Sequence, residues 1–411
     1  MSLGWLIVGG GIHGVHVAAR LIGEGGIPSE EVQILDPEPK LLTRWRARSQ
    51  TIGMRHLRSP SVHHLGLDPL GLHAYAEGRW AGVRGLFAPP YDRPALSLFD
   101  AHCDAVIESL DLPSLHLRGK ATSCELTEDG VHVQLMDGHH VRASQVVLAV
   151  GPPEQPQLPP WAHDAAGRVH HLFQPHFTGW PLEAQSVAVV GGGISAAQAA
   201  LRLVDEGHEV HLIARHEFRE HQFDSDPGWL GPKYMRGFAR ERSLDSRRQM
   251  ITEARNKGSV PPDILRELMS SIRGGHIKLL RGEVAGLHST THAVDVELSS
   301  GDRLGVDTVL LATGFGNERP GGELVEGLIR DEGLPCSECG FPIVDEGLRW
   351  HPRVYVTGAL AELVLGPTGR NIAGARRSAE RILRSLGPHS QAEAVTSGAH
   401  GVVPLSGNNS A

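Results

Sequence analysis

Two stretches of the chain repeat the same pattern of hydrophobic and polar positions. Each begins with a short apolar run, passes through three consecutive glycines and continues with apolar residues at helical spacing. The first is GWLIVGGGIHGVHVAARLI at residues 4–22, and the second is SVAVVGGGISAAQAALRLV at residues 186–204. A buried strand, a tight turn and an amphipathic helix form the first half of a βαβ unit. The pattern therefore predicts an α/β fold with two separate parallel-sheet domains.

The glycines of the first copy have the spacing of a phosphate-binding turn. Gly9, Gly11 and Gly14 follow the strand expected at residues 3–8 in the order G-x-G-x-x-G. This spacing permits a tight turn, close approach of a pyrophosphate and close packing of the helix on the strand. The next apolar run ends at Asp36, roughly 20 residues later, where a carboxylate accepts hydrogen bonds from ribose hydroxyls. A glycine-rich surface turn is the alternative, but the complete pattern favours a Rossmann-like dinucleotide site.

The second copy differs at two positions that change the expected cofactor. Its third glycine is replaced by alanine, a small residue that this turn tolerates. The apolar run at residues 209–214 ends at Arg215, where the first copy has its acid, and a guanidinium pairs well with a 2′-phosphate. The sequence therefore predicts NADPH here, with a solvated surface arginine as the alternative. The candidate contacts in this turn are Gly191, Gly193, Ser195 and Ala196.

Two dinucleotide sites in one chain imply electron transfer between two cofactors, and the expected pair is FAD in the first site and NADPH in the second. Three later apolar runs end in small residues, which adds Gly151, Thr313, Gly314 and Gly358 as candidate cofactor contacts.

Prolines between residues 153 and 159 indicate a linker between two domains. The sequence predicts a discontinuous FAD-binding domain at residues 1–160 and 312–387, an inserted NAD(P)H-binding domain at 182–311 with a helical insert at about 221–268, and a disordered tail at 388–411.

Composition narrows the classes of partner. The 411 residues include 39 Lys and Arg against 47 Asp and Glu, and this formal charge of −8 argues against nucleic acid as a partner. No apolar run approaches the roughly 20 residues of a membrane span. The chain opens without a basic leader, and four cysteines do not form a disulfide scaffold. We expect a cytoplasmic protein without a membrane partner, and oligomerisation with further copies of the chain is left open.

The order of these motifs resembles the class B flavoprotein monooxygenases, particularly the branch that N-hydroxylates lysine or ornithine. The resemblance covers about residues 1–385 and rests on GGGIHG, VGPPEQPQLP, GGGISA, DTVLLATGF and a late Thr-Gly before a closing helix. It implies that FAD reduced by NADPH reacts with molecular oxygen to a C4a-hydroperoxide. One oxygen atom then passes to a nucleophilic nitrogen or sulfur of a small substrate. No side chain need act as a nucleophile, so catalytic residues are left unassigned.

The linker fingerprint of this family is divided between two frames. Gly167 and His171 match its beginning, but Pro175 stands where the family has an aromatic residue. An ending similar to that of Baeyer–Villiger enzymes is formed by His176, Trp180 and Pro181. A further departure is His13, which follows Ile12 where the ornithine enzymes usually have proline. These departures leave the subclass open.

The resemblance also implies that residues 44–65 cross the flavin face. This segment supplies Trp45, Met54 and Leu57, followed by Arg58, in the order the family uses. A basic surface loop with ordinary apolar anchors is the alternative.

A second flavin contact is expected before the closing helix at residues 372–386. The candidates are Gly366, Pro367, Thr368 and Asn371. The positive end of the helix would stabilise negative charge on the pyrimidine of the reduced flavin, and Thr368 or Asn371 would cap the helix or bond the flavin. A capped surface helix is the alternative.

The cysteines and the paired histidines are weaker candidates for a redox or metal site. Cys336 and Cys339 form a C-x-x-C that a redox dithiol would use, but their place late in the chain favours incidental or loop-stapling cysteines. The histidine pairs at 63–64, 139–140 and 170–171 lack carboxylate or cysteine companions at ligand spacing, so no metal is expected.

Three functions therefore stay open. The first is a monooxygenase that uses FAD, NADPH and molecular oxygen on a small amine or similar substrate. The second is an NADPH-dependent reductase with a quinone, disulfide or protein acceptor. The third is a flavin-binding protein without catalysis.

Overall fold

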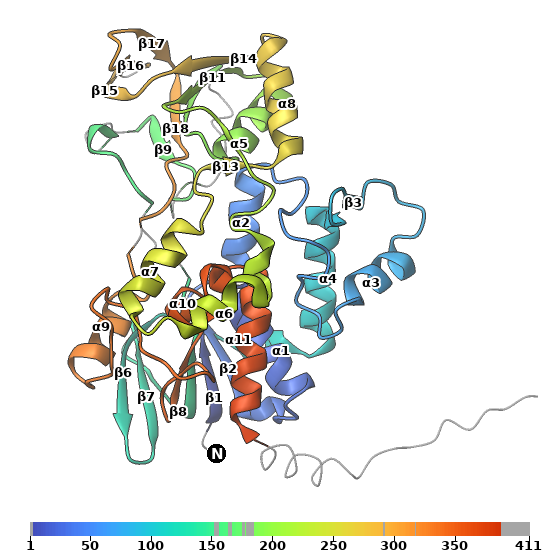
Figure 1. Ribbon diagram of the computed structural model, residues 1–411, viewed down its shortest axis with the longest axis vertical. Helices are drawn as coiled ribbons and strands as arrows, with labels where there is room; N and C mark the ends of the chain where they lie inside the picture. Colours follow the sequence, from blue (N-terminus) through green and yellow to red (C-terminus); the bar gives the residue numbers. More distant parts are fainter. Residues whose placement is uncertain are drawn as a thin grey trace, which may run out of the picture.

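Two sheets with parallel central strands, one in each half of the molecule, form the framework of the structure (Figure 1). The computed structural model describes residues 3–151, 156–162, 167–174, 177, 185–290, 292–316 and 318–387. Pro153, Pro175, His176, Trp180, Pro181 and the tail at 388–411 lie outside the described residues.

The first sheet has the order β19-β20-β8-β1-β2-β5, and β6 and β7 extend it from β8. Its central strands are buried on both faces, which explains why the sequence of β1 is a continuous apolar run rather than an alternating one. The strands are β1 (Leu3–Val8), β2 (Val32–Asp36), β5 (His116–Arg118), β6 (Ala121–Thr127), β7 (Gly130–Leu135), β8 (His140–Leu148), β19 (Arg349–His351) and β20 (Val354–Val356).

Helices from both ends of the chain cover this sheet. Helices α1 (Ile12–Gly23) and α11 (Ile372–Ser385) lie side by side, so the last helix returns to the first glycine turn (Figure 1). Helix α9 (Gly322–Arg330) packs on β6. A helical region beside the sheet contains α2 (Thr43–Thr51), α3 (Gly71–Arg79), α4 (Leu96–Ser109) and the short hairpin of β3 (Phe87–Ala88) and β4 (Arg93–Pro94).

The second sheet is parallel throughout, with the order β14-β11-β10-β18-β9. Alternate residues of β10 serve two cores: Val187 and Val189 pack under α5 and α8, whereas Ala188 and Val190 pack on an antiparallel three-stranded sheet. The elements are β9 (Val169–His171), β10 (Ser186–Val190), β11 (Glu209–Ala214), β14 (Ile277–Arg281), β18 (Thr308–Leu311), α5 (Ile194–Asp205), α8 (Pro262–Arg273), β15 (Val284–Ser289), β16 (Val294–Leu298) and β17 (Arg303–Val306).

The segment between β11 and α8 folds back over the first half of the molecule. Trp229, Phe238 and Ile251 of this segment share a small core with Phe341 and Leu363 of the C-terminal part. Figure 1 shows α6 and α7 beside α10. The elements are β12 (Arg219–Glu220), the 3₁₀ helix η4 (Pro227–Leu230), α6 (Pro232–Arg240), α7 (Leu244–Glu253), β13 (Ser259–Val260) and α10 (Glu362–Leu365).

The predicted α/β class with two dinucleotide-binding folds is confirmed, because each glycine turn joins a central parallel strand to a helix. The strand expected to end at Gly151 ends earlier, at Leu148. Helix α8 packs on α5, so within the expected insert it belongs to the second sheet, and β9 joins that sheet from before residue 182. Among the described residues, no helix has both the length and the apolar character required to cross a bilayer.

Candidate cofactor and active site

The first glycine turn leaves its backbone open at the start of α1. Gly9 accepts a positive φ of 118°, and its N–H donates to the carbonyl oxygen of Leu35 at 2.8 Å. A Cβ on Gly14 would overlap the carbonyl oxygen of Gly9, so helix and turn approach as only glycine allows. A Cβ on Gly11 would meet no atom within 4 Å, and no side chain caps the helix there. The turn therefore fits a pyrophosphate at the N-terminus of α1.

Asp36 is fixed next to this turn. Its Oδ2 accepts the Gly10 N–H at 2.6 Å, and its Oδ1 accepts the Glu38 N–H at 2.9 Å. Each carboxylate oxygen can accept a further hydrogen bond, so the carboxylate can also accept bonds from ribose hydroxyls.

The second turn has the same frame, but a neighbouring loop lies against it. The Gly191 N–H donates to the carbonyl oxygen of Ile213 at 2.9 Å, and Ala196 is buried in the first turn of α5. Ser195 is half-buried in the first turn of α5. A Cβ on Gly193 would lie 3.2 Å from the Cα of Gly258, so the loop before β13 borders the space that a nucleotide would occupy.

Arg215 lies where the chain leaves β11. Its side chain is 68% exposed and lies 3.8 Å from a carboxylate oxygen of Glu283. This loose ion pair leaves the guanidinium accessible to a 2′-phosphate.

The segment expected at the flavin face is divided between surface and core. Trp45 is half-buried on α2 and lies against Phe99 with ring centroids 5.6 Å apart. Met54 packs against the cores of both sheets. Leu57 is buried in the first core, so its side chain does not face open space. Arg58 points to the insert instead, where its guanidinium donates to the carbonyl oxygens of His221 and Gln222.

The two chain crossings between the sheets lie side by side. Thr313 donates its hydroxyl to the carbonyl oxygen of Gln157 at 2.6 Å, and the Gln157 N–H donates to the carbonyl oxygen of Gly314 at 2.9 Å. Gly151 is exposed beyond the end of β8. These pairs hold the two crossings together at the boundary between the halves.

The turn before α11 meets the first glycine turn through His13, a contact that was not included among the candidate site residues. His13 Nδ1 lies 2.8 Å from Thr357 Oγ1, and the ring lies against Gly358. Burial lowers the pKa of His13 to about 4, although hydrogen bonds to the backbone of Arg370 and Asn371 oppose the shift. The imidazole is therefore neutral at pH 7. The position of His13 inside the glycine turn was the sequence feature that could have identified this contact.

The side chains of Thr368 and Asn371 do not cap α11, which differs from one of the two roles expected for them. Asn371 is the N-cap residue, but its amide donates to Asp224 at 3.1 Å, and the Thr368 hydroxyl accepts from Arg377 at 3.4 Å. Gly366 has φ 74° and lies against Trp229 and Met235. The turn is thus enclosed by the insert, while the start of α11 keeps backbone N–H groups that no side chain caps.

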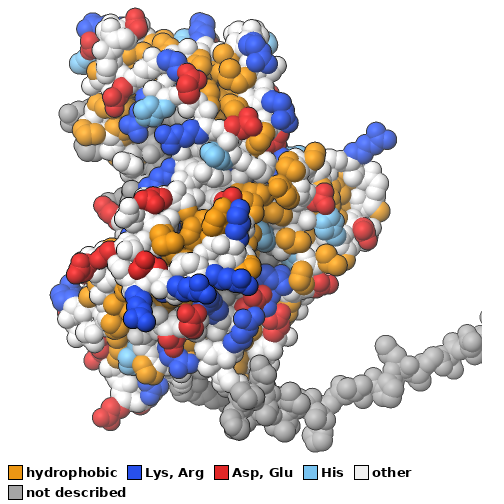
Figure 2. Space-filling model, in the orientation of Figure 1, with side chains coloured by type: hydrophobic (Ala, Val, Ile, Leu, Met, Phe, Trp, Pro, Cys, Tyr) orange, Lys and Arg blue, Asp and Glu red, His pale blue; other side chains and the backbone are white. Residues whose placement is uncertain are grey.

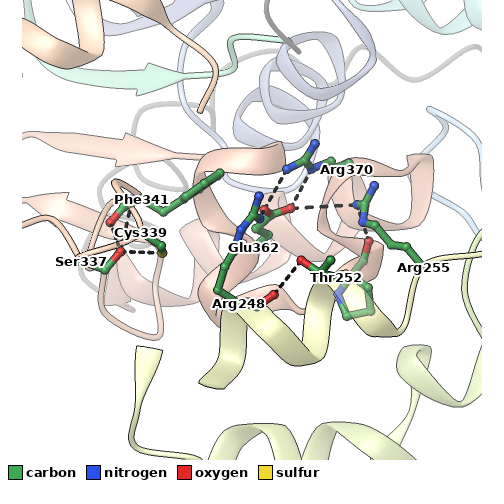
Figure 3. A network of polar contacts seen from close by, with 9 residues as sticks. Arg248, Thr252, Arg255, Ser337, Cys339, Phe341, Glu362 and Arg370 are labelled. Carbon is green, nitrogen blue, oxygen red and sulfur yellow. Dashed lines mark hydrogen bonds and ion pairs between the residues drawn. The ribbon is translucent and has the colours of Figure 1, made fainter. Parts of the chain in front are cut away.

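A buried carboxylate organises three arginines behind this turn (Figure 3). Glu362 is fully buried and accepts two hydrogen bonds from Arg370, at 2.7 and 2.8 Å, and one from Arg248. Arg255 lies 3.9 Å away and donates to the carbonyl oxygen of Pro367 at 2.9 Å. Burial and the two other arginines lower the pKa of Arg255 to about 10, and burial and the same cations lower the pKa of Lys257. Positive charge therefore exceeds negative charge beside the turn. The local sequence pattern gave no indication of this cluster.

A cavity of about 380 Å³ lies in front of the same turn, and it too was not predicted from the sequence. Its lining combines four aromatic side chains with polar residues. The lining residues are Tyr91, His221, Gln222, Phe223, Ser225, Asp226, Pro227, Trp229, Tyr234, Ala254 and Asn256. Because Trp229 lies against Gly366 and Asp224 binds Asn371, the cavity borders the turn expected at the flavin.

The C-x-x-C lies near this region as two free thiols. Cys339 Sγ lies 3.0 Å from Ser337 Oγ, and Cys336 Sγ donates to the carbonyl oxygen of Ser337 at 3.2 Å. The guanidinium of Arg248 lies 4.2 Å from the ring centroid of Phe341 in the same loop (Figure 3).

Figure 2 shows Lys and Arg side chains gathered on the face of α6 and α11.

Three protein-family profiles match the chain. An FAD-NAD(P)-binding family matches residues 6–153. Two families described as pyridine nucleotide-disulphide oxidoreductase match residues 101–247 and 185–328.

A curated relative matches part of the chain. It is an uncharacterized CzcO-like oxidoreductase of Geobacillus kaustophilus (strain HTA426), 32% identical over 113 residues. The match spans 27% of this chain and about a third (32%) of the relative's length.

Solved structures match almost the whole chain. Ornithine hydroxylase (PvdA) from Pseudomonas aeruginosa has a TM-score of 0.73 at 20% identity, covering 94% of this chain and 99% of the other. The ornithine N-hydroxylase KtzI of Kutzneria sp. 744, with reduced FAD, NADP⁺ and L-ornithine, has a TM-score of 0.73 at 18% identity, with coverage of 94% and 99%. The bacillithiol disulfide reductase of Bacillus cereus has a TM-score of 0.59 at 17% identity, with coverage of 96% and 100%. The chain therefore carries the FAD- and NAD(P)-binding domains of a pyridine-nucleotide-dependent oxidoreductase on the fold shared with the N-hydroxylating flavin monooxygenases.

Proposed function

We propose that this chain is an FAD-dependent, NADPH-consuming monooxygenase that transfers one oxygen atom to a small nucleophilic substrate such as an amine. In the balanced reaction, one atom of O₂ enters the product, the other leaves as water, and NADPH supplies two electrons with a proton from solvent. The observation that carries the proposal is the presence of two phosphate-binding turns in one chain whose fold matches the ornithine hydroxylases over 94% of its length.

We assign FAD to residues 1–160 and 312–387, and the nicotinamide cofactor to 182–311. Bound FAD would carry electrons from NADPH to oxygen. Around it, the open backbone at Gly11 would hold the pyrophosphate and Asp36 the ribose. We assign further contacts of the flavin to Gly9, Gly14, Trp45, Met54, Leu57, Gly151, Thr313, Gly314, Gly358, Gly366, Pro367, Thr368 and Asn371. We assign those of NADPH to Gly191, Gly193, Ser195, Ala196 and Arg215.

The chain's own residues shape the site for negative charge. The uncapped start of α11 and the arginines around Glu362 lie beside the turn at 366–371, where the flavin pyrimidine is expected. Neutral His13 is packed behind the turn, and its half-buried ring helps to exclude water. On the opposite side of the site, the Arg58 guanidinium donates to the carbonyl oxygen of Gln222 and so connects the first half of the chain to the insert.

The decisive experiment is stepwise reduction and reoxidation. Purified chain loaded with FAD is mixed with NADPH under anaerobic conditions, and the flavin absorbance is followed. We expect bleaching, and then, on admitting oxygen with a panel of amines and thioethers, oxygenated product at the expense of released hydrogen peroxide. A flavin that NADPH fails to bleach would contradict any enzymatic role and favour a flavin-binding protein without catalysis.

The second candidate is an NADPH-dependent disulfide, quinone or protein reductase. It is favoured by the free thiols of Cys336 and Cys339 near the cationic cluster and by the fold match to bacillithiol disulfide reductase. Under anaerobic conditions, steady NADPH oxidation that requires a disulfide or quinone would support the reductase. Product formation that requires oxygen would support the monooxygenase.

A further inference from the structure

The cavity in front of the turn at 366–371 is lined in part by four aromatic side chains that contact one another in pairs. The rings of Tyr91 and Phe223 are in tilted contact with centroids 5.1 Å apart, and those of Trp229 and Tyr234 are in tilted contact at 5.3 Å. Tyr91 has φ 70° and remains 57% exposed, so the loop holds a bulky aromatic residue at the rim in a left-handed conformation. Such walls favour a flat ring over a flexible chain, because aromatic pairs gain energy from face and edge contacts.

One wall of the cavity has its backbone carbonyls already bonded. The Arg58 guanidinium donates hydrogen bonds to the carbonyl oxygens of His221 and Gln222 at 2.8 and 2.7 Å. The side-chain amide of Asn256 donates to the carbonyl oxygen of Phe223 at 3.0 Å. The side-chain amide of Gln222 is different. Within the described part of the chain, its Oε1 and Nε2 are both buried and neither has a hydrogen-bond partner. Buried polar atoms are normally paired, so this amide is suited to a ligand that offers a donor or an acceptor.

The described lining of the cavity offers a single carboxylate for a cationic ligand. Among the lining residues that the structure describes, Asp226 alone carries a permanent charge, and Lys233 lies 4.0 Å from its carboxylate. The nearby cluster of Arg248, Arg255 and Arg370 adds positive charge. An aliphatic diamine carries two positive charges at neutral pH, and Asp226, which already lies near Lys233, is the one carboxylate among the described lining residues that would balance them.

From these observations we propose that the cavity binds an uncharged aromatic amine, and that aromatic amines are the substrate class of the proposed monooxygenase. An aromatic amine keeps its nitrogen lone pair unprotonated at neutral pH, so no side chain has to remove a proton first. Gln222 Oε1 accepts an N–H of the amine, and the ring lies between the aromatic walls. One oxygen atom of O₂ then enters an N–H bond to give an aryl hydroxylamine, the other leaves as water, and NADPH supplies two electrons with a proton from solvent. This inference rests on the proposed function and differs from the ornithine named for the neighbouring structures.

The test measures binding without turnover. Ligand-observed NMR on the full chain loaded with FAD compares aniline, benzylamine and cyclohexylamine, which separate ring planarity from charge. We expect aniline to bind at least about tenfold more tightly than cyclohexylamine, with benzylamine also weaker than aniline. Tyr91→Ala and Gln222→Leu should each weaken aniline binding about three- to tenfold. Leu70→Ala, an exposed apolar side chain outside the cavity, is the matched control and should change nothing.

Three results would overturn the inference: cyclohexylamine binding as tightly as aniline, aniline binding that both cavity variants leave unchanged, or aniline binding that is lost when FAD is loaded. The last would assign the cavity to the cofactor. The binding experiment does not use NADPH. A failure to bind aniline is therefore distinct from a failure of the proposed function, which is measured by the bleaching of the flavin by NADPH.

Discussion

Arg215 decides which nicotinamide cofactor we expect. Its exposed guanidinium is available at the end of β11 for a 2′-phosphate, which NADH lacks. Arg215→Ala should therefore raise the KM for NADPH about tenfold while changing that for NADH by less than about twofold. Steady-state NADPH and NADH oxidation measures both constants. Arg303→Ala, a similarly exposed arginine on β17, is the control. Equal loss with both coenzymes would show that Arg215 does not contact the phosphate.

His16 gives the molecule an acid-sensitive point. Its Nδ1 lies 3.1 Å from the carbonyl oxygen of Leu65, and its Nε2 accepts from Arg20 at 3.1 Å, so the neutral ring satisfies both contacts. Burial, with the Arg20 charge next, lowers the pKa of His16 from 6.5 to about 3. The unfolded chain binds this proton more readily, so the stability present above pH 6.5 is lost as the pH falls toward about 3.

His16→Gln retains a donor and an acceptor without a titrating group. Between pH 6 and pH 4, the free energy of unfolding of this variant should change with a slope smaller by about 1.4 kcal/mol per pH unit. Urea unfolding at several pH values measures the slope. His276→Gln, at an exposed surface position, should leave it unchanged. An unaltered slope in His16→Gln would mean that this ring is protonated in the folded protein.

At the level of elements, Glu362 connects the insert to the C-terminal helices. Its fully buried carboxylate bonds Arg370 beside the turn and Arg248 on α7. Removing one member of a buried ion cluster leaves the other charges uncompensated, so Glu362→Gln should lower the free energy of unfolding by about 3 kcal/mol. Hydrogen exchange should also rise in α6 and α7 before the rest of the protein. Glu323→Gln, which breaks the exposed pair with Arg330, should cost less than about 0.5 kcal/mol. Similar losses in the two variants would contradict the role of the cluster.

The elements that were predicted well are those encoded locally. The strand at Leu3–Val8 and the glycine turns follow from short apolar runs and fixed spacing, and the structure reproduces them within a residue or two. Glu362 gave no such signal, because two of its three arginine partners lie more than 100 positions away. Gln222 gave none either, because Arg58, which holds its backbone carbonyl at the cavity, is 164 positions away. Leu57 shows the opposite difficulty: its place in a motif predicts a flavin contact, but its side chain is buried in the core, so the proposed contact falls to its backbone. Local patterns locate phosphate-binding turns, whereas the charge and shape of a substrate cavity depend on how the insert folds over the first sheet.

At the scale of the whole molecule, electron transfer requires the two halves to keep one relative position. Arg93, from the first half, is 1% exposed and pairs with Asp263 at the start of α8 at 2.7 Å. It also donates to the carbonyl oxygen of Pro89 at 2.8 Å. Nearby, Arg55 forms ion pairs with Asp205 and Glu267 of the second half, but both of these pairs are exposed. The buried contact is therefore the one expected to set the geometry.

Arg93→Gln should leave FAD affinity unchanged but slow flavin bleaching by NADPH at least about tenfold, because a small displacement of the reacting rings has a large effect on rate. Asp263→Asn should behave similarly, and the double variant should be no slower than either single one if both act through the same contact. Stopped-flow reduction gives the rates, and thermal unfolding checks that the fold is retained. Arg55→Gln, which removes only the exposed pairs, should stay within about twofold of the parent protein. If Arg93→Gln reduces its flavin at the parental rate, the halves are aligned by other contacts, such as the paired crossings at Gln157 and Thr313.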